Sequence, residues 1–283
     1  SALIRSVVAT KEQMNELRSI ESTLLRYENP FVLADMIMRF SKNSWFKTNY
    51  YEVFHRVYFF LGQILAKKTF ENLESRIVDF LYEEYLKTPY YDKSWKIAIA
   101  TAIGKSLRSS AEPKLYSLLK AQKKNFLSGV IQSLIMALGK VAMRVGTYDY
   151  LSEFTKYDSN KAIITATLWA MGRMGSRQTS SLTIIEALKP LKRISSIIES
   201  SSDNEIIMNA LYWIGEVMDQ RALYTTGIAD EKTVLKISSM LSKKKERISR
   251  QNITRIIDSI LAMLSYEEGT QLVDYEAFLK KNR

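Results

Sequence analysis

The chain has 283 residues, 46% of them hydrophobic, and carries 41 Lys and Arg against 30 Asp and Glu, a formal net charge of +11. It contains no cysteine, which excludes disulfides, thiolate metal sites and cysteine nucleophiles, and its single histidine, His55, excludes histidine-rich metal centres. Ten glycines and four prolines argue against a loop-rich or all-β protein.

The first hundred residues predict several amphipathic helices. Residues 12–27 place apolar side chains on one helix face, and Asn29 and Pro30 then form a start signal for the next helix, with Asn as the cap and Pro in the first turn. Residues 50–67 form the first strongly apolar helix, and residues 70–86 form another that stops before Thr88-Pro89. This part of the chain therefore predicts a run of helices with short connections.

From residue 50 onward, one apolar helix recurs and each copy ends near a glycine. The residue before each glycine is aliphatic, and apolar residues return four, five, eight and nine places upstream, as on one face of a helix. Successive glycines lie 42, 35, 33 and 43 residues apart, which is the period of stacked helix pairs. The five glycines are Gly62, Gly104, Gly139, Gly172 and Gly215.

A shorter amphipathic segment lies between each pair of glycines, so each unit predicts a helix A, a turn and a helix B that carries the glycine. Glycine near the end of helix B allows either a close approach of neighbouring helices or a left-handed exit from the helix. Pro190 falls inside one helix A and should bend or split it. Residues 271–282 predict a final helix that caps the array.

The B helices resemble those of HEAT or armadillo-like repeats, and the best matches end at Ala102-Ile103-Gly104 and Ala170-Met171-Gly172. The resemblance covers roughly residues 49–265 and implies an all-α, right-handed α-solenoid of about six or seven stacked helix pairs. We expect a single array over residues 1–283. It would have irregular repeats in 1–91, regular repeats in 92–220, and C-terminal repeats with a cap in 221–283.

The excess positive charge is concentrated, because residues 101–200 hold 15 Lys and Arg against 6 Asp and Glu. Cations recur one place and about one turn after the glycines of three successive repeats, which predicts a basic ridge along one edge. Such a ridge suits an acidic partner, although cations near helix C-termini are also stabilised by the helix dipole alone. The ridge residues are Lys105, Arg108, Lys140, Arg144, Arg173 and Arg177.

A second candidate surface lies three and seven places before each glycine, on the face of the B helices that lines the concave side of HEAT-like arrays. Exposed aromatic and methionine side chains there would bind a peptide or a partner helix. The alternative is that neighbouring repeats bury them. The predicted partner-binding residues are Gln132, Met136, Thr165, Trp169, Met208 and Tyr212.

HEAT-like repeats mostly serve as binding platforms, so the resemblance implies a non-enzymatic scaffold for a protein or peptide partner. The alternative is nucleic-acid binding, as in the HEAT-like DNA glycosylases, whose chemistry requires a carboxylate beside aromatics and cations. No Asp or Glu lies near Trp169 on its helix, so we predict no catalytic residue, and we expect no metal or cofactor. The longest apolar runs are too short to cross a bilayer, and we expect a soluble, cytoplasmic protein, although a start without methionine also fits a removed leader.

Overall fold

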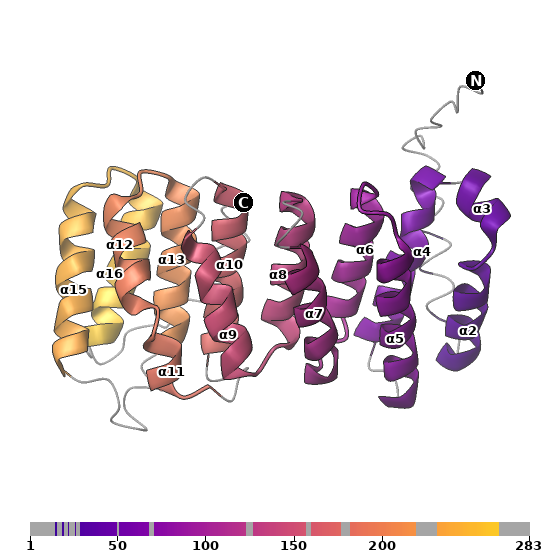
Figure 1. Cartoon of the computed structure of the whole chain (residues 1–283). Coiled ribbons are helices and arrows are strands. Elements are labelled where there is room, and N and C mark those ends of the chain that lie inside the picture. The colour runs from indigo at the N-terminus through magenta and orange to yellow at the C-terminus, as the bar shows by residue number, and fades with distance from the viewer. Residues whose placement is uncertain are drawn as a thin grey trace, which may run out of the picture. The chain divides into compact units, whose positions relative to one another are not determined.

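The computed structural model describes residues 29–49, 51–67, 71–122, 127–156, 160–176, 182–218 and 231–265, with four isolated positions between 15 and 26. All regular elements of these segments are helices, and none of the helices is long and apolar enough to cross a membrane. The chain forms two compact units, residues 1–141 and 142–283 (Figure 1). The single continuous array and its internal boundaries stay predictions, and the expected helices at 12–27 and 271–282 lie outside the continuously described segments.

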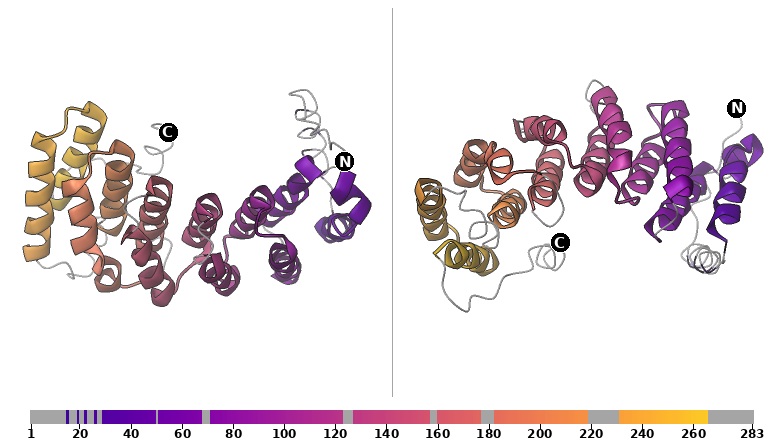
Figure 2. Two further views of the ribbon diagram at one scale, coloured as in Figure 1. Left: turned by 45° about the horizontal axis from the view of Figure 1, so that its top comes forward. Right: turned by 90° about the horizontal axis from the view of Figure 1, so that it is seen from below.

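Unit 1 is a double layer of helices. The B helices α4, α6 and α8 pack side by side, with α5 against α6 and α7 against α8, while α2 and α3 contact α4 (Figures 1 and 2). The elements are α2 (Pro30–Phe40), α3 (Ser44–Asn49), α4 (Tyr51–Ala66), α5 (Glu71–Lys87), α6 (Lys93–Gly104), the 3-10 turn η1 (Ser109–Ala111), α7 (Glu112–Gln122) and α8 (Ser128–Val141).

Unit 2 repeats the same arrangement. The B helices α10, α13 and α16 follow one another, and α12 packs against both α13 and α15. The elements are α9 (Val145–Ser152), the 3-10 turn η2 (Glu153–Lys156), α10 (Lys161–Gly175), α11 (Ile184–Leu188), α12 (Leu191–Ser200), α13 (Asn204–Val217), α15 (Glu231–Glu246) and α16 (Gln251–Ser265).

Two sequence signals for helix boundaries, one for a helix start and one for a helix break, act as predicted. The side chain of Asn29 accepts hydrogen bonds from the backbone N–H groups of Phe31 and Val32, which satisfies donors that have no partner within α2, and Pro30 occupies the first helical position. Pro190 splits one predicted helix A into α11 and α12, because proline has no N–H to continue the helical ladder.

In unit 1 the repeated glycines permit close contact between successive B helices. A Cβ atom on Gly62 would lie 2.8 Å from the Cα of Ala102, and one on Gly104 would lie 2.8 Å from the Cα of Ala137. Ala102 and Ala137 each precede the glycine of their own helix by two residues, so both helix pairs meet in the same register. Of the two roles predicted for these glycines, close approach is therefore the one that the structure shows.

Unit 2 has the same contact between α10 and α13. A Cβ on Gly172 would lie 3.3 Å from the Cα of Trp213, two residues before Gly215, and only 2.6 Å from the ring of Tyr212. The absent side chain of Gly172 thus provides the space that the Tyr212 ring fills. Gly62, Gly104 and Gly172 occupy equivalent places in their repeats, as the spacing predicted.

Tyr148 connects three helices inside unit 2. Its hydroxyl donates to the carbonyl oxygen of Ala187 at 2.8 Å and accepts from Nε1 of Trp213 at 2.8 Å, so α9, α11 and α13 share one buried polar contact. All three residues are buried, and burial raises the pKa of the Tyr148 hydroxyl. A buried indole N–H needs a partner, and Tyr148 supplies it.

Candidate partner-binding surface

The outward positions of the B helices of unit 1 are partly exposed, as predicted. They lie three and seven places before Gly62, Gly104 and Gly139, so each helix contributes two of them to one layer. We call this surface the B face of unit 1, and it consists of the half-buried side chains His55, Phe59, Ile97, Thr101, Gln132 and Met136.

The B face carries one apolar side chain on each of its three helices, and we call these three, Phe59, Ile97 and Met136, the apolar row; Ile97 lies one turn earlier on its helix than the other two. His55 and Phe59 form an edge-to-face ring pair on α4, with centroids 6.1 Å apart. On the facing helices, a Cβ on Gly129 of α8 would lie 3.5 Å from Cδ1 of Ile97, so the Ile97 side chain extends toward α8 at Gly129. Phe59, Ile97 and Met136 supply one apolar group from each of the three helices.

Two of the three helices that carry the apolar row, α6 and α8, contain positively charged but no negatively charged residues. Neither α6 nor α8 contains an Asp or Glu, whereas Lys105 and Lys140 follow their glycines directly and are half-buried. Nζ of Lys105 lies 5.9 Å from the centroid of the Phe59 ring, within the range of a cation–π interaction. Phe59 of the B face therefore lies beside Lys105 of the predicted ridge.

Arg108, also predicted in the ridge, is held within unit 1. Its Nε lies 2.5 Å from Oε2 of Glu74, a buried carboxylate on α5 that also accepts a hydrogen bond from Ser110. The pKa of Glu74 is nevertheless raised, because burial of the carboxylate outweighs the neighbouring Arg108. Arg108 thus compensates a buried charge of its own protein and is less available to a partner than Lys105.

The remaining ridge residues belong to unit 2. Arg144 is exposed at the start of α9, and the guanidinium of Arg173 lies 5.6 Å from the ring centroid of Trp169. Arg177 lies outside the described residues. The ridge over all three repeats stays a prediction, and its members in unit 1 are Lys105, Arg108 and Lys140.

The predicted exposure of the partner-binding residues in unit 2 is wrong. Trp169 and Tyr212 are only 7% and 2% exposed, and Thr165 and Met208 are buried as well. The Tyr212 ring fills the space at Gly172, and the Thr165 hydroxyl donates to the carbonyl of Lys161 in its own helix. Of the six predicted residues, only Gln132 and Met136 retain partial exposure.

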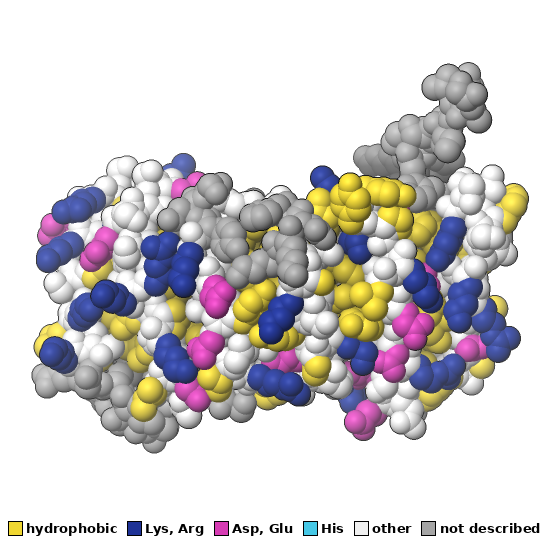
Figure 3. All heavy atoms as spheres, viewed as in Figure 1, with side chains coloured by type: hydrophobic (Ala, Val, Ile, Leu, Met, Phe, Trp, Pro, Cys, Tyr) yellow, Lys and Arg dark blue, Asp and Glu magenta, His cyan; other side chains and the backbone are white. Residues whose placement is uncertain are grey.

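Two exposed apolar features of unit 1 were not predicted. Leu107 follows α6 with a φ of 56°, is 61% exposed and lies between Lys105 and Arg108 in sequence. Tyr90 and Tyr91 form an edge-to-face pair in the connection between α5 and α6, and hydrophobic side chains gather near the upper end of α6 in Figure 3. Both features lie beyond helix ends, where helical periodicity carries no information.

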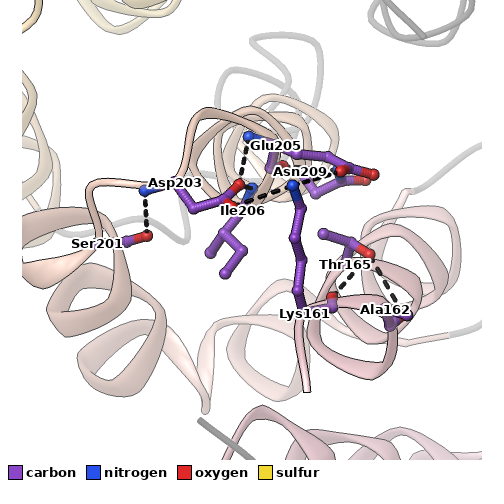
Figure 4. Close-up of polar contacts among 8 residues, drawn as sticks. All are labelled: Lys161, Ala162, Thr165, Ser201, Asp203, Glu205, Ile206 and Asn209. Carbon is purple, nitrogen blue, oxygen red and sulfur yellow. Dashed lines mark hydrogen bonds and ion pairs between the residues drawn. The ribbon is translucent and has the colours of Figure 1, made fainter. Parts of the chain in front are cut away.

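A third unpredicted feature is an ion pair between successive B helices of unit 2. Nζ of Lys161, at the start of α10, lies 3.0 Å from Oδ2 of Asp203 and 2.9 Å from Oε2 of Glu205, at the start of α13 (Figure 4). The hydrogen bonds to Glu205 and Asp203 raise the pKa of Lys161. Asp203 also caps α13 by accepting from the N–H groups of Glu205 and Ile206, so this cluster serves to join helices.

Comparison with known proteins identifies the fold. No family model matches the sequence, and no curated protein matches it significantly. The crystal structure of the archaeal HEAT-like repeats protein from Thermococcus onnurineus NA1 is similar, with a TM-score of 0.59 at 14% sequence identity. The similarity covers 90% of this chain and 97% of that one. The stacked helix pairs, the glycine register and this similarity together show that the chain has the HEAT-like repeat fold.

Proposed function

We propose that this repeat protein is a non-enzymatic scaffold that binds a partner protein on the B face of unit 1. The observation that carries the proposal is the partial exposure of Phe59, Ile97 and Met136, one on each of three successive B helices, with Lys105 beside the Phe59 ring and Lys140 one turn beyond Met136. Partly exposed apolar side chains on adjacent parallel helices suit a partner helix laid across them.

The charge of the B face favours an acidic partner. An amphipathic helix would place its apolar side chains on the row and its carboxylates near Lys105 and Lys140. The absence of Asp and Glu from α6 and α8 means that such a helix meets little like charge there. Charge complementarity of this kind mainly raises the association rate and rejects basic partners. Nucleic acid offers the same negative charge but no matching apolar side chains.

A designed peptide tests the proposal directly. The probe is a fluorescent 18-residue helix with Leu on one face and Glu on the other, and the matched control peptide carries Lys in place of Glu. Fluorescence anisotropy should show saturable binding of the Glu peptide and none of the Lys peptide. Met136→Glu should weaken binding by ~10-fold or more, since it places a carboxylate in the apolar row. Lys192→Glu on α12 in unit 2 should leave binding unchanged.

The assay also separates the protein partner from nucleic acid. A 20-base-pair duplex serves as competitor, because phosphate contacts would make affinity fall steeply with salt and would ignore base sequence. We expect the duplex to compete poorly and Met136→Glu to leave any duplex binding unchanged. Equal binding of the Glu and Lys peptides, or displacement of the Glu peptide by low concentrations of duplex, would overturn the proposed function.

A further inference from the structure

Lys47 of α3 inserts its ammonium group among side chains from three other helices of unit 1. Nζ lies 2.7 Å from Oε2 of Glu84 on α5. It also lies 5.8 Å from the ring centroid of Phe54 on α4 and 5.9 Å from that of Trp95 on α6. The hydroxyl of Tyr58 donates to the same carboxylate oxygen at 3.0 Å.

The receiving groups are more deeply buried than the lysine. The Glu84 side chain is 4% exposed and Phe54 and Trp95 are buried, whereas the Lys47 side chain is 28% exposed. A buried carboxylate with two aromatic rings beside it provides both the charge and the ring faces that bind an ammonium group. Lys87 is the other cation near Glu84, but it lies 3.7 Å away and is largely exposed.

The helix that carries Lys47 is short, and most of its described side chains are exposed. Helix α3 spans only six residues, Ser44–Asn49, and of its described side chains only Lys47 is partly buried. Trp45, for example, is exposed although its apolar ring would gain from burial. Among the side chains of α3 that the structure describes, Lys47 is therefore the one that reaches inward, and the site that it fills is built by α4, α5 and α6.

We propose that Glu84, Phe54 and Trp95 form a binding site for a primary ammonium group, and that Lys47 occupies it as an internal ligand. The ligand class is the lysine side chain of a partner protein, which takes the place of Lys47 when α3 moves away. The 2.7 Å ion pair requires an N–H donor, so a primary amine fits and an acetylated amine does not. This site is independent of the B face.

The test uses the full chain and Nα-acetyl-lysine methylamide as the probe, detected by saturation-transfer NMR. Lys47→Ala empties the site, and this variant should bind the probe with a dissociation constant of about 1–10 mM, ~10-fold more tightly than the wild type. The double variant Lys47→Ala/Glu84→Gln should lose that binding. The Nε-acetylated probe should not bind to any of the proteins.

Lys114→Ala is the matched control, because Lys114 also pairs with a carboxylate of unit 1, Asp79 at 2.8 Å, but no aromatic ring of the described residues faces its ammonium group. It should bind the probe no better than the wild type. A folded Lys47→Ala variant that fails to bind the probe at about 50 mM overturns the proposal, as does equal binding by Lys47→Ala and Lys114→Ala.

A measurement on the wild type covers the case in which Lys47→Ala does not fold. Hydrogen exchange of residues 44–49 is followed with and without about 50 mM probe. Displacement of Lys47 should release α3 and accelerate exchange there, while α7 exchanges as before. Unchanged exchange in residues 44–49 at that concentration overturns the proposal.

Discussion

Replacing Tyr148 by phenylalanine tests whether its buried hydroxyl connects the helices of unit 2. The ring stays and no cavity forms, so the change isolates two hydrogen bonds of 2.8 Å, to the Ala187 carbonyl and from Trp213 Nε1. Each bond contributes about 0.5–1.5 kcal/mol, and a buried donor or acceptor left without a partner costs about 1–3 kcal/mol. With two partners affected, Tyr148→Phe should lower the free energy of unfolding by about 2–4 kcal/mol.

The assay is urea unfolding followed by circular dichroism and tryptophan fluorescence. Tyr90→Phe is the control, because the Tyr90 side chain is exposed, and it should change stability by less than about 0.5 kcal/mol. In a double-mutant cycle, Trp213→Phe should cost less in the Tyr148→Phe background than in the wild type, since the shared bond is already lost. A loss below about 1 kcal/mol for Tyr148→Phe, or additive effects in the cycle, would refute this reasoning.

Three further predictions concern packing, ion pairing and pH. Gly104→Ala places a Cβ 2.8 Å from the backbone of Ala137 and should destabilise unit 1 by about 1–3 kcal/mol in urea unfolding. By contrast, Gly146→Ala on α9, with no atom within 4 Å, should be neutral or stabilising, and similar losses for both would contradict the close-contact register. Lys161→Ala should cause only a small loss that is screened at high salt, and a loss that persists in about 1 M NaCl would contradict an exposed ion pair. Because the folded-state pKa of Glu74 is raised, its contribution to stability is present at low pH and declines as pH rises through that pKa, from about 4.5 upward. The free energy of unfolding of Glu74→Gln should therefore rise relative to that of the wild type between about pH 4 and pH 7. A stability difference between the two proteins that does not vary with pH would refute the raised pKa.

The repeat architecture was predictable because its signals are local. Gly62, Gly104 and Gly172 each lie against the next B helix, and the aliphatic residue before each of them is buried, so the same local pattern recurs with the period of the sequence. Asn29 and Pro190 act on the backbone within a few residues, so their effects could also be predicted. The HEAT-like fold thus follows from patterns that need no knowledge of distant contacts.

The exposure of the candidate partner-binding surface was predicted only in part, because exposure depends on contacts between repeats. The same position relative to the glycine is half-buried for Met136 and buried for Tyr212, since the Tyr212 ring lies over Gly172 of the preceding B helix. Arg108 follows the periodic pattern of cations, yet its partner Glu74 lies 34 residues earlier in the chain. Neither contact leaves a signal in the helical periodicity.

The central claim is that a partner helix binds across the B face of unit 1, and NMR of methyl-labelled protein tests it most directly. The Glu-rich amphipathic peptide is titrated into protein labelled at Ile and Met methyl groups. Ile97 and Met136 should shift or broaden progressively, whereas Met208, which is buried in unit 2, should not change. Saturable binding that leaves the methyl signals of Ile97 and Met136 unchanged would contradict the claim.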